Sequence, residues 1–180
     1  MKKRTIWLLT FVMVLFAFAL PACAIPVSQS GVTWSTSPYE LQRREGYAIA
    51  ENDKGYTNYS YEDVVRGRAS TLTYTYSGNA LVLAEYYFFN NTSEDPFIST
   101  LYKLMDQFGE PYYDDVEYIV DALQRSVGKT YSTPGDYISA CSWTAYDHTE
   151  IYLYFHADSL NYSILFVEPD FFWAALMPEI

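Results

Sequence analysis

The sequence is short of the residues that most enzymes and metalloproteins use for their chemistry. Among 180 residues there are two cysteines, Cys23 and Cys141, and two histidines, His148 and His156. It contains no G-x-S-x-G, H-E-x-x-H, P-loop or C-x-x-C motif, so the enzyme and metal classes defined by those motifs are excluded. His156 and Asp158 could supply two metal ligands, but a zinc site needs more than two. We therefore expect neither a metal nor a cofactor.

Basic residues are also scarce. Lys and Arg number 11 against 22 Asp and Glu, which gives a formal net charge of −11. Three of the bases are Lys2, Lys3 and Arg4, and no acid precedes Glu40, so a chain without its N-terminus is more acidic still. Nucleic-acid binding depends on neutralising phosphates, and adsorption to anionic lipid depends on basic clusters. The composition argues against both kinds of partner.

Aromatic residues, in contrast, are abundant. They make up 19% of the chain and include 19 tyrosines. Half of the residues are hydrophobic, whereas disordered chains are poor in aromatic and hydrophobic residues. The length fits a leader followed by one domain of about 150 residues, which can bury a sizeable core. We therefore expect a single globular domain over residues 31–180.

The first 24 residues, 1–24, have the organisation of a signal peptide. A basic stretch precedes 15 nearly unbroken apolar residues (6–20), which is shorter than the ~20 residues that a membrane span needs. Two cleavage sites stay open. Cleavage before Cys23 follows a lipobox-like sequence and gives a protein lipidated at Cys23, whereas cleavage after Ala24 gives a freely secreted one. In either case Cys141 has no partner in the mature chain, so a disulfide-stapled fold is excluded.

A capping box marks the first helix of the domain. Ser37 can cap the helix, Pro38 suits its first position, and Glu40 completes the box. Gly46 then provides a stop. Residues 47–69 are polar and rich in tyrosine, and their pattern is weak.

The remaining patterns predict two helices and five strands. Alternation with period two marks the strands, and apolar residues at i, i+3, i+4 and i+7 mark the helices. The expected segments are a short tether at 25–30, strands at 72–76, 81–89, 138–146, 150–156 and 161–168, helices at 95–108 and 115–126, and an apolar tail at 171–177 that docks on the core. The predicted fold class is α+β, an antiparallel sheet of about five strands with helices packed on one face. The order also suggests a duplicated helix-hairpin unit.

Three short stretches carry a resemblance to known proteins. They are Gly31-Val32-Thr33-Trp34 with the capping box and Glu45-Gly46, the segment 101–111 (LYKLMDQFGEP), and a late hairpin with Ser142-Trp143. In these the chain resembles a group of small secreted bacterial proteins of unknown function, many of which look like lipoproteins. Its order of elements is similar to the beta-lactamase-inhibitor-protein and outer-membrane-assembly-lipoprotein folds, which pack paired helices on an antiparallel sheet. The resemblance implies a protein-binding role and supplies no catalytic residue.

One face of the late hairpin is the candidate binding surface. If the hairpin turns at residues 147 and 148, alternation places Trp143, Tyr152, Tyr154 and His156 on one face, with Tyr162 near by in the next strand. The other face then holds apolar residues beneath the two later helices. Tyr and Trp give large contact areas at low entropy cost, so an open face of this kind favours binding. The alternative is that residues 47–69 or the tail cover it.

Two catalytic interpretations compete with binding. The same pairing makes Cys141 and His156 diagonal neighbours at ~7 Å, which is too far for a base already poised on its nucleophile. Acidic residues gather at 94–95 and 114–115, where helix capping explains them. The sequence therefore favours an exported, non-enzymatic binding module, a cell-surface lipoprotein that engages a protein or another envelope ligand. The alternative is a cell-envelope hydrolase that uses acidic residues.

Overall fold

The computed structural model describes residues 26–65, 67–89, 91, 93–128, 137–156 and 159–176, and their side chains except those of 137–139. The predicted signal peptide, both cleavage sites and the predicted lipidation residue Cys23 lie outside the described residues. Among the described residues, no helix has both the length and the apolar character that crossing a membrane requires.

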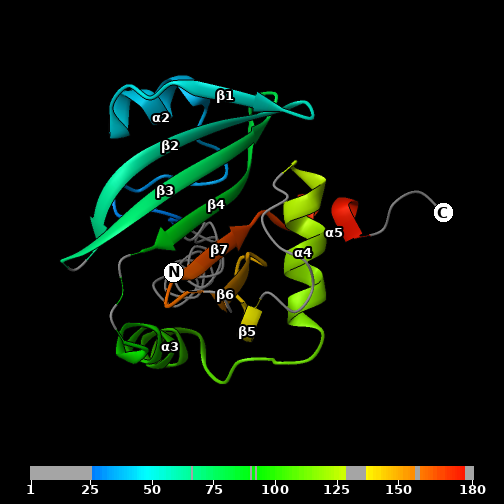
Figure 1. Ribbon diagram of the computed structural model, residues 1–180. Coiled ribbons are helices and arrows are strands. Elements are labelled where there is room, and N and C mark those ends of the chain that lie inside the picture. Colours follow the sequence, from blue (N-terminus) through cyan, green and yellow to red (C-terminus); the bar gives the residue numbers. More distant parts are fainter. Residues whose placement is uncertain are drawn as a thin grey trace, which may run out of the picture.

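The fold is α+β and is built around one open, antiparallel, seven-stranded sheet (Figure 1). The strand order is β1-β2-β3-β4-β7-β6-β5, so a four-stranded meander and a three-stranded meander join where β4 pairs with β7. The elements are α2 (Pro38–Glu45), β1 (Ala50–Asp53), β2 (Tyr56–Val65), β3 (Arg68–Ser77), β4 (Ala80–Phe88), α3 (Asp95–Phe108), α4 (Val116–Ser126), β5 (Tyr137–Thr144), β6 (Glu150–His156), β7 (Tyr162–Val167) and α5 (Pro169–Leu176).

The sheet has two more strands than the five predicted, because β1 and β2 form within residues 47–69. In β2, Tyr59 and Tyr61 pair with Tyr74 and Leu72 of β3, while the polar Asn58 lies on the opposite side. A tyrosine carries both an apolar ring and a hydroxyl, so its alternation with polar residues gives little contrast in hydropathy. Each half of the fold is thus a helical part followed by a meander, where a helix and a hairpin were predicted.

The capping box predicted at the first helix is confirmed. Helix α2 begins after Ser37, whose hydroxyl accepts a hydrogen bond from the backbone N–H of Glu40 at 3.3 Å. The Glu40 carboxylate in turn accepts from the backbone N–H of Ser37. The helix ends at Gly46, where φ is +99°, a left-handed conformation that glycine adopts without a steric penalty.

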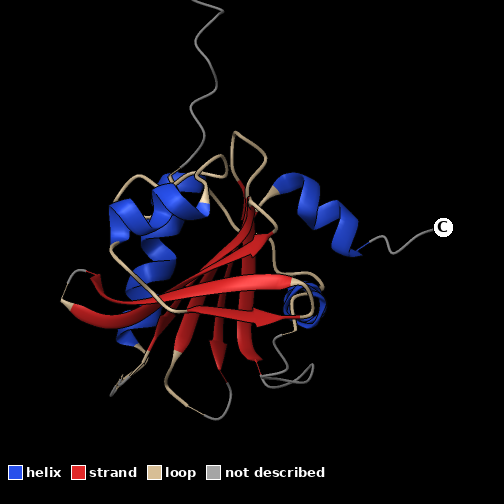
Figure 2. Cartoon of the chain, turned by 90° about the horizontal axis from the view of Figure 1, so that it is seen from above, coloured by secondary structure: helices blue, strands red, loops and turns tan. Residues whose placement is uncertain are grey.

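Helices cover both faces of the sheet, which corrects the prediction that they pack on one face (Figure 2). Leu104 of α3 packs in one core cluster with Leu153, whereas Leu123 of α4 packs in the other cluster with Tyr152. We call these sides the α3 face, which α2 and α3 cover, and the α4 face, which α4 and α5 cover. Strand β6 is interior to the sheet and buried on both sides, so one layer of helices could not shield it from water.

The chain passes from one face to the other around the outer strand of the sheet. Between α3 and α4, Tyr112 forms a two-hydrogen-bond bridge with Ser142 of the edge strand β5, at 2.8 and 2.9 Å. The bridge provides hydrogen-bond partners for the backbone N–H and C=O of Ser142 at the outer edge of the sheet. Helix α4 therefore begins on the opposite side of the sheet from α3.

The predicted tether at 25–30 is wrong for its described part, because residues 26–30 fold back onto the domain. Val27 is buried, and its N–H donates to the carbonyl of Val32 at 2.8 Å. Ser28 and Ser30 donate hydrogen bonds to the carboxylate of Glu45 at the end of α2. Burial of the apolar side chain of Val27 stabilises the packing of this segment on the domain. The sequence pattern around Val27 does not predict that burial.

Candidate functional site

The late hairpin has a different register from the one predicted, and this separates the predicted binding residues. Ala145 and Thr149 close the hairpin, with three residues between them and a positive φ of 65° at His148. That is the three-residue type of hairpin loop, with a turn followed by a left-handed residue. Because the loop has one residue more than predicted, Trp143 lies opposite Ile151 instead of Tyr152, and the side chains of residues 140–144 change face relative to those of β6.

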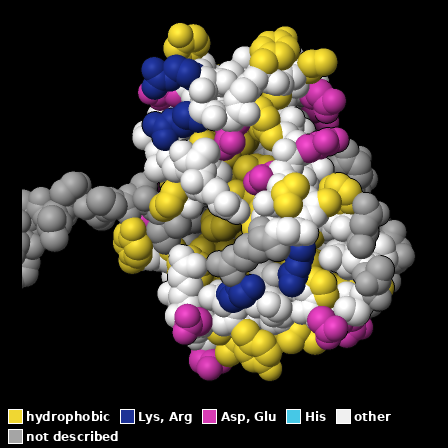
Figure 3. All heavy atoms as spheres, turned by 90° about the vertical axis from the view of Figure 1, so that its left-hand side faces the viewer, with side chains coloured by type: hydrophobic (Ala, Val, Ile, Leu, Met, Phe, Trp, Pro, Cys, Tyr) yellow, Lys and Arg dark blue, Asp and Glu magenta, His cyan; other side chains and the backbone are white. Residues whose placement is uncertain are grey.

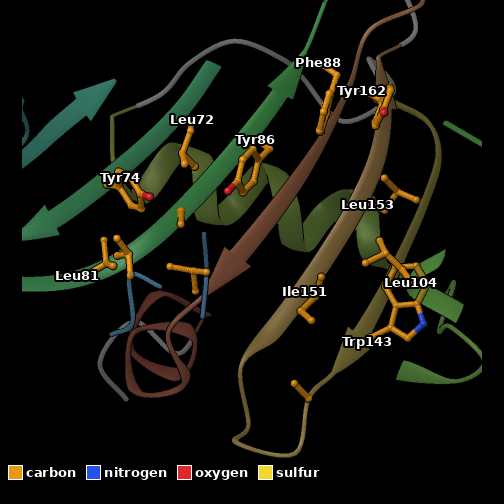
Figure 4. Close-up of a cluster of buried hydrophobic side chains, with 14 of the residues drawn as sticks. Leu72, Tyr74, Leu81, Tyr86, Phe88, Leu104, Trp143, Ile151, Leu153 and Tyr162 are labelled. Atoms are coloured by element: carbon orange, nitrogen blue, oxygen red, sulfur yellow. The ribbon is translucent and has the colours of Figure 1, made fainter. Parts of the chain in front are cut away.

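Trp143 therefore lies on the α3 face and is core. It is 1% exposed, and its indole N–H donates to the carbonyl of Gly109 at 2.9 Å, just beyond the end of α3. Figure 4 shows it on the same side of the sheet as Ile151 and Leu153. The single open patch predicted for Trp143 with the tyrosines is not formed.

Tyr152 and Tyr154 lie on the α4 face and are also buried, at 1% exposure each. The hydroxyl of Tyr154 donates to Glu85 at 2.5 Å and accepts from the side-chain amide of Gln124 at 3.0 Å. His156 is half-buried at the end of β6, with a ring nitrogen 3.3 Å from the hydroxyl of Ser163. These three hydrogen bonds connect β6 to β4, to α4 and to β7, a structural role typical of buried polar groups.

The catalytic interpretations receive no geometric support. Cys141 lies opposite Leu153 on the α3 face, whereas the pattern of β6 places His156 on the other side of the sheet. Burial raises the pKa of the Cys141 thiol to about 12, which disfavours the thiolate. Asp121 is buried and pairs with Arg125 at 2.6 Å on the same helix. Within the described residues, no group of three or more His, Cys, Asp or Glu side chains could hold a metal ion.

A hollow on the α3 face is the candidate ligand site. Seven strands at ~4.8 Å spacing span about 29 Å, whereas a helix with its side chains is ~10–12 Å wide. Helix α2 covers the β2–β3 side, where Tyr74 donates to the carboxylate of Glu45 at 2.6 Å. Helix α3 covers the β5–β6 side, where the rings of Phe97 and Phe155 lie 5.2 Å apart. The middle strands β4 and β7 are left between them.

The hollow has a volume of about 450 Å³ and lies over these two strands, between residues 26–29 and α3. Figure 3 looks onto this side of the molecule, where hydrophobic side chains show inside a depression and basic side chains lie beside it. Its floor is apolar and mostly aromatic, with Tyr86, Phe88, Tyr162, Ile164 and Phe166 among the lining residues. Among the residues that the structure describes, the lining includes two basic residues and no acid.

Polar groups gather at one end of the hollow. Arg68 of β3 donates through one terminal nitrogen to the Tyr162 hydroxyl at 3.1 Å and to the carbonyl of Pro96 at 3.0 Å. The hydroxyl of Thr100 lies 3.1 Å from that of Tyr162. Lys103, one turn further along α3, is exposed at the rim. The arrangement can therefore receive an apolar body on its floor and a negatively charged or hydrogen-bonding group at this end.

Of the five residues predicted to bind, only Tyr162 lines the hollow. Sequence reasoning missed Arg68, because it follows a stretch with a weak strand pattern, and Lys103, because it falls on the polar side of a helix. It missed Val27 because the segment looked like a tether. One signal in the sequence could have indicated Arg68 and Lys103. Basic residues are rare after the leader, so each of them is a candidate for binding an anionic group.

The comparisons with known proteins found no similarity. No protein-family model matches the chain, and no curated protein or solved structure matches it.

Proposed function

We propose that this protein is an exported, non-enzymatic binding module, and that the hollow on the α3 face is its ligand site. The observation that carries the proposal is an apolar, aromatic floor with a few polar groups converging at one end. Sites for small ligands have this composition, and their volumes run from ~300 to 1,000 Å³. The volume of about 450 Å³ lies within that range.

Export is supported by the N-terminal sequence, and we propose that the mature protein is anchored by lipid at Cys23. The mature chain then lacks residues 1–22 and carries an acylated first residue that holds it in the membrane fraction. Intact-mass measurement of the protein from the membrane fraction tests this. An unmodified chain that begins at Ile25 would contradict lipid anchoring and leave simple secretion.

The ligand site is tested with a neutral fluorescent hydrophobe, N-phenyl-1-naphthylamine, added to the purified full chain. We expect saturable binding with enhanced fluorescence. Gln107→Trp should abolish it, because Gln107 is an exposed residue of α3 at the rim and a bulky side chain there fills the mouth. Asp106→Trp is the matched control, since Asp106 is the exposed neighbouring residue and does not line the hollow.

Two results would overturn the proposal. One is the absence of saturable probe binding to the folded wild-type chain. The other is an equal effect of Gln107→Trp and Asp106→Trp, which would place the bound probe elsewhere. Circular dichroism of both variants shows that each has kept the native fold before binding is compared.

A further inference from the structure

We infer that the ligand of the hollow is a single-chain anionic amphiphile, that is, an aliphatic chain ending in a carboxylate or phosphate group. This inference rests on the proposed function and specifies its ligand. The first ground is charge. The chain has twice as many acids as bases, yet the described part of the lining contains no acid and includes Arg68 and Lys103.

The second ground is the way Arg68 is held. Its side chain is half-buried, and hydrogen bonds to Tyr162 and to the carbonyl of Pro96 fix one terminal nitrogen of the guanidinium. A guanidinium has five N–H donors in a rigid plane, and the bonds among the described residues engage only that nitrogen. The remaining donors have the planar geometry that a carboxylate or phosphate accepts in a bidentate manner. The Thr100 hydroxyl donates to the same Pro96 carbonyl at 2.9 Å and lies 3.1 Å from the Tyr162 hydroxyl, so it helps to fix the groups that hold the guanidinium.

The third ground is the floor. Phe88 stacks on Tyr162 at the end where Arg68 lies, and from there Tyr86, Ile164 and Phe166 extend the apolar surface along β4 and β7. Such a surface gains about 25 cal/mol for each Å² of aliphatic chain that it removes from water. A volume of about 450 Å³ is at the low end for ligand sites, so it fits one aliphatic chain better than the two chains of a membrane phospholipid.

The position of the hollow relative to the proposed anchor is consistent with this ligand. Pro26 lines the hollow and is three residues from Cys23, a length of chain that reaches at most about 10 Å. A lipid-anchored protein would therefore hold the site close to the bilayer surface, where amphiphiles with one chain are found. The overall acidity of the protein keeps it from adsorbing to anionic lipid as a whole, while the local basic pair selects an anionic headgroup.

The experiment is displacement of N-phenyl-1-naphthylamine from the purified full chain by three ligands with the same chain, used below their micelle concentrations. We expect oleate to displace the probe at least about tenfold more effectively than oleyl alcohol, and oleylamine to be the weakest, because a hydrogen-bonded charge pair is worth that factor or more. A lysophosphatidate with the oleoyl chain distinguishes the source of the anion. Stronger displacement by it than by oleate identifies a lipid phosphate as the preferred headgroup, and the reverse identifies a free fatty acid.

Variants at the basic end separate charge recognition from apolar binding. Lys103→Glu changes an exposed side chain, so the variant should keep the fold. Its affinity for oleate should fall about three- to tenfold, while its affinity for oleyl alcohol stays unchanged. Arg68→Ala should weaken oleate about tenfold or more, with partial recovery in Arg68→Lys. Arg43→Ala on α2, where the base does not line the hollow, is the control and should change oleate affinity less than about twofold.

The outcomes distinguish this inference from the proposed function. If the probe does not bind at all, the ligand site itself is wrong. If the probe binds but oleyl alcohol competes as well as oleate, or Lys103→Glu and Arg68→Ala leave oleate affinity unchanged, the site stands and the anionic ligand is wrong.

Discussion

The two faces of the sheet are covered to different extents, although the same strands form both. On the α4 face, α4 lies against the sheet with Val120 and Leu123 fully buried. There the hydroxyl of Tyr154 hydrogen-bonds both to Gln124 of α4 and to Glu85 of β4. On the α3 face, two helices lie over the two ends of the sheet and leave the hollow between them. The α3 face thus holds a hollow between two helices that stand apart, whereas α4 and α5 pack over β4, β5, β6 and β7 and leave Ser60, Glu62 and Val64 of β2 exposed on the other face.

Alkaline pH should have the largest effect, and it should act first on the α3 face. Burial raises the pKa of Tyr74, Tyr76 and Tyr86 on that face, and of Tyr152 on the α4 face, above the ordinary value of 10.0. A tyrosine with a raised pKa holds its proton more tightly in the folded state, so its contribution to stability is full below pH 10 and falls as the pH rises above it.

We therefore expect the part of the tyrosinate absorbance at 295 nm that comes from these four buried tyrosines to appear together with loss of circular dichroism above about pH 10. Backbone amides of β3 and β4 should begin to exchange before those of α4, since three of these four tyrosines lie on the α3 face. Complete tyrosine ionisation in a chain that keeps its native circular dichroism would contradict this account.

Removal of the largest side chain on the α3 face should have the next largest effect. Trp143→Ala deletes a buried indole and its hydrogen bond to Gly109, which should lower the free energy of unfolding by about 3–5 kcal/mol. Trp173→Ala is the matched control, because Trp173 is 58% exposed on α5, and it should cost less than about 0.5 kcal/mol. If urea denaturation gives the same decrease in the free energy of unfolding for Trp143→Ala and Trp173→Ala, Trp143 is not part of the core.

A pair of leucines compares the packing of the two faces directly. Leu123→Ala removes a fully buried side chain from the α4 face and should lower the free energy of unfolding by about 2–5 kcal/mol. Leu104→Ala should cost less, about 1–2 kcal/mol, because Leu104 borders a hollow that already exists. Chemical denaturation of both variants gives the comparison, and a larger loss for Leu104→Ala would mean that the α3 face is as tightly packed as the other.

The smallest effect is expected at the cap of α2. Ser37→Ala removes the hydroxyl that accepts from the backbone N–H of Glu40 and should cost about 1 kcal/mol. Ser35→Ala, at an exposed position two residues earlier, should stay within about 0.3 kcal/mol. If thermal unfolding midpoints of the two variants coincide, the capping bond contributes nothing to stability.

The sequence predicts the local features of this fold better than their assembly. The cap at Ser37, the helices α3 and α4, and the strands from β3 onward follow from nearest-neighbour patterns, which depend on a few adjacent residues. The strand β2 was not predicted, because tyrosine is both apolar and polar and its alternation with polar residues gives little contrast in hydropathy. The register at Trp143 depends on one loop residue. The side of the sheet on which each helix packs depends on contacts between residues distant in sequence, and the periodicity of a single segment carries no information about such contacts.

The candidate site was less predictable than the fold. Its lining comes from the N-terminal segment, four strands and α3, so no single stretch of sequence carries a motif for it. Only Tyr162 was predicted, and for a different reason, as a neighbour of the aromatic hairpin. A site formed by incomplete coverage of a sheet is a property of the packing as a whole.

The most direct test of the central claim, that the α3 face binds a ligand and the α4 face does not, is methyl NMR of the full chain labelled at isoleucine. Ile164 lines the hollow, and Ile119 packs on the α4 face. Titration with N-phenyl-1-naphthylamine should shift the Ile164 methyl signal in a saturable manner and leave that of Ile119 in place. A shift of Ile119 without one of Ile164, or no saturable shift of either, would contradict the account.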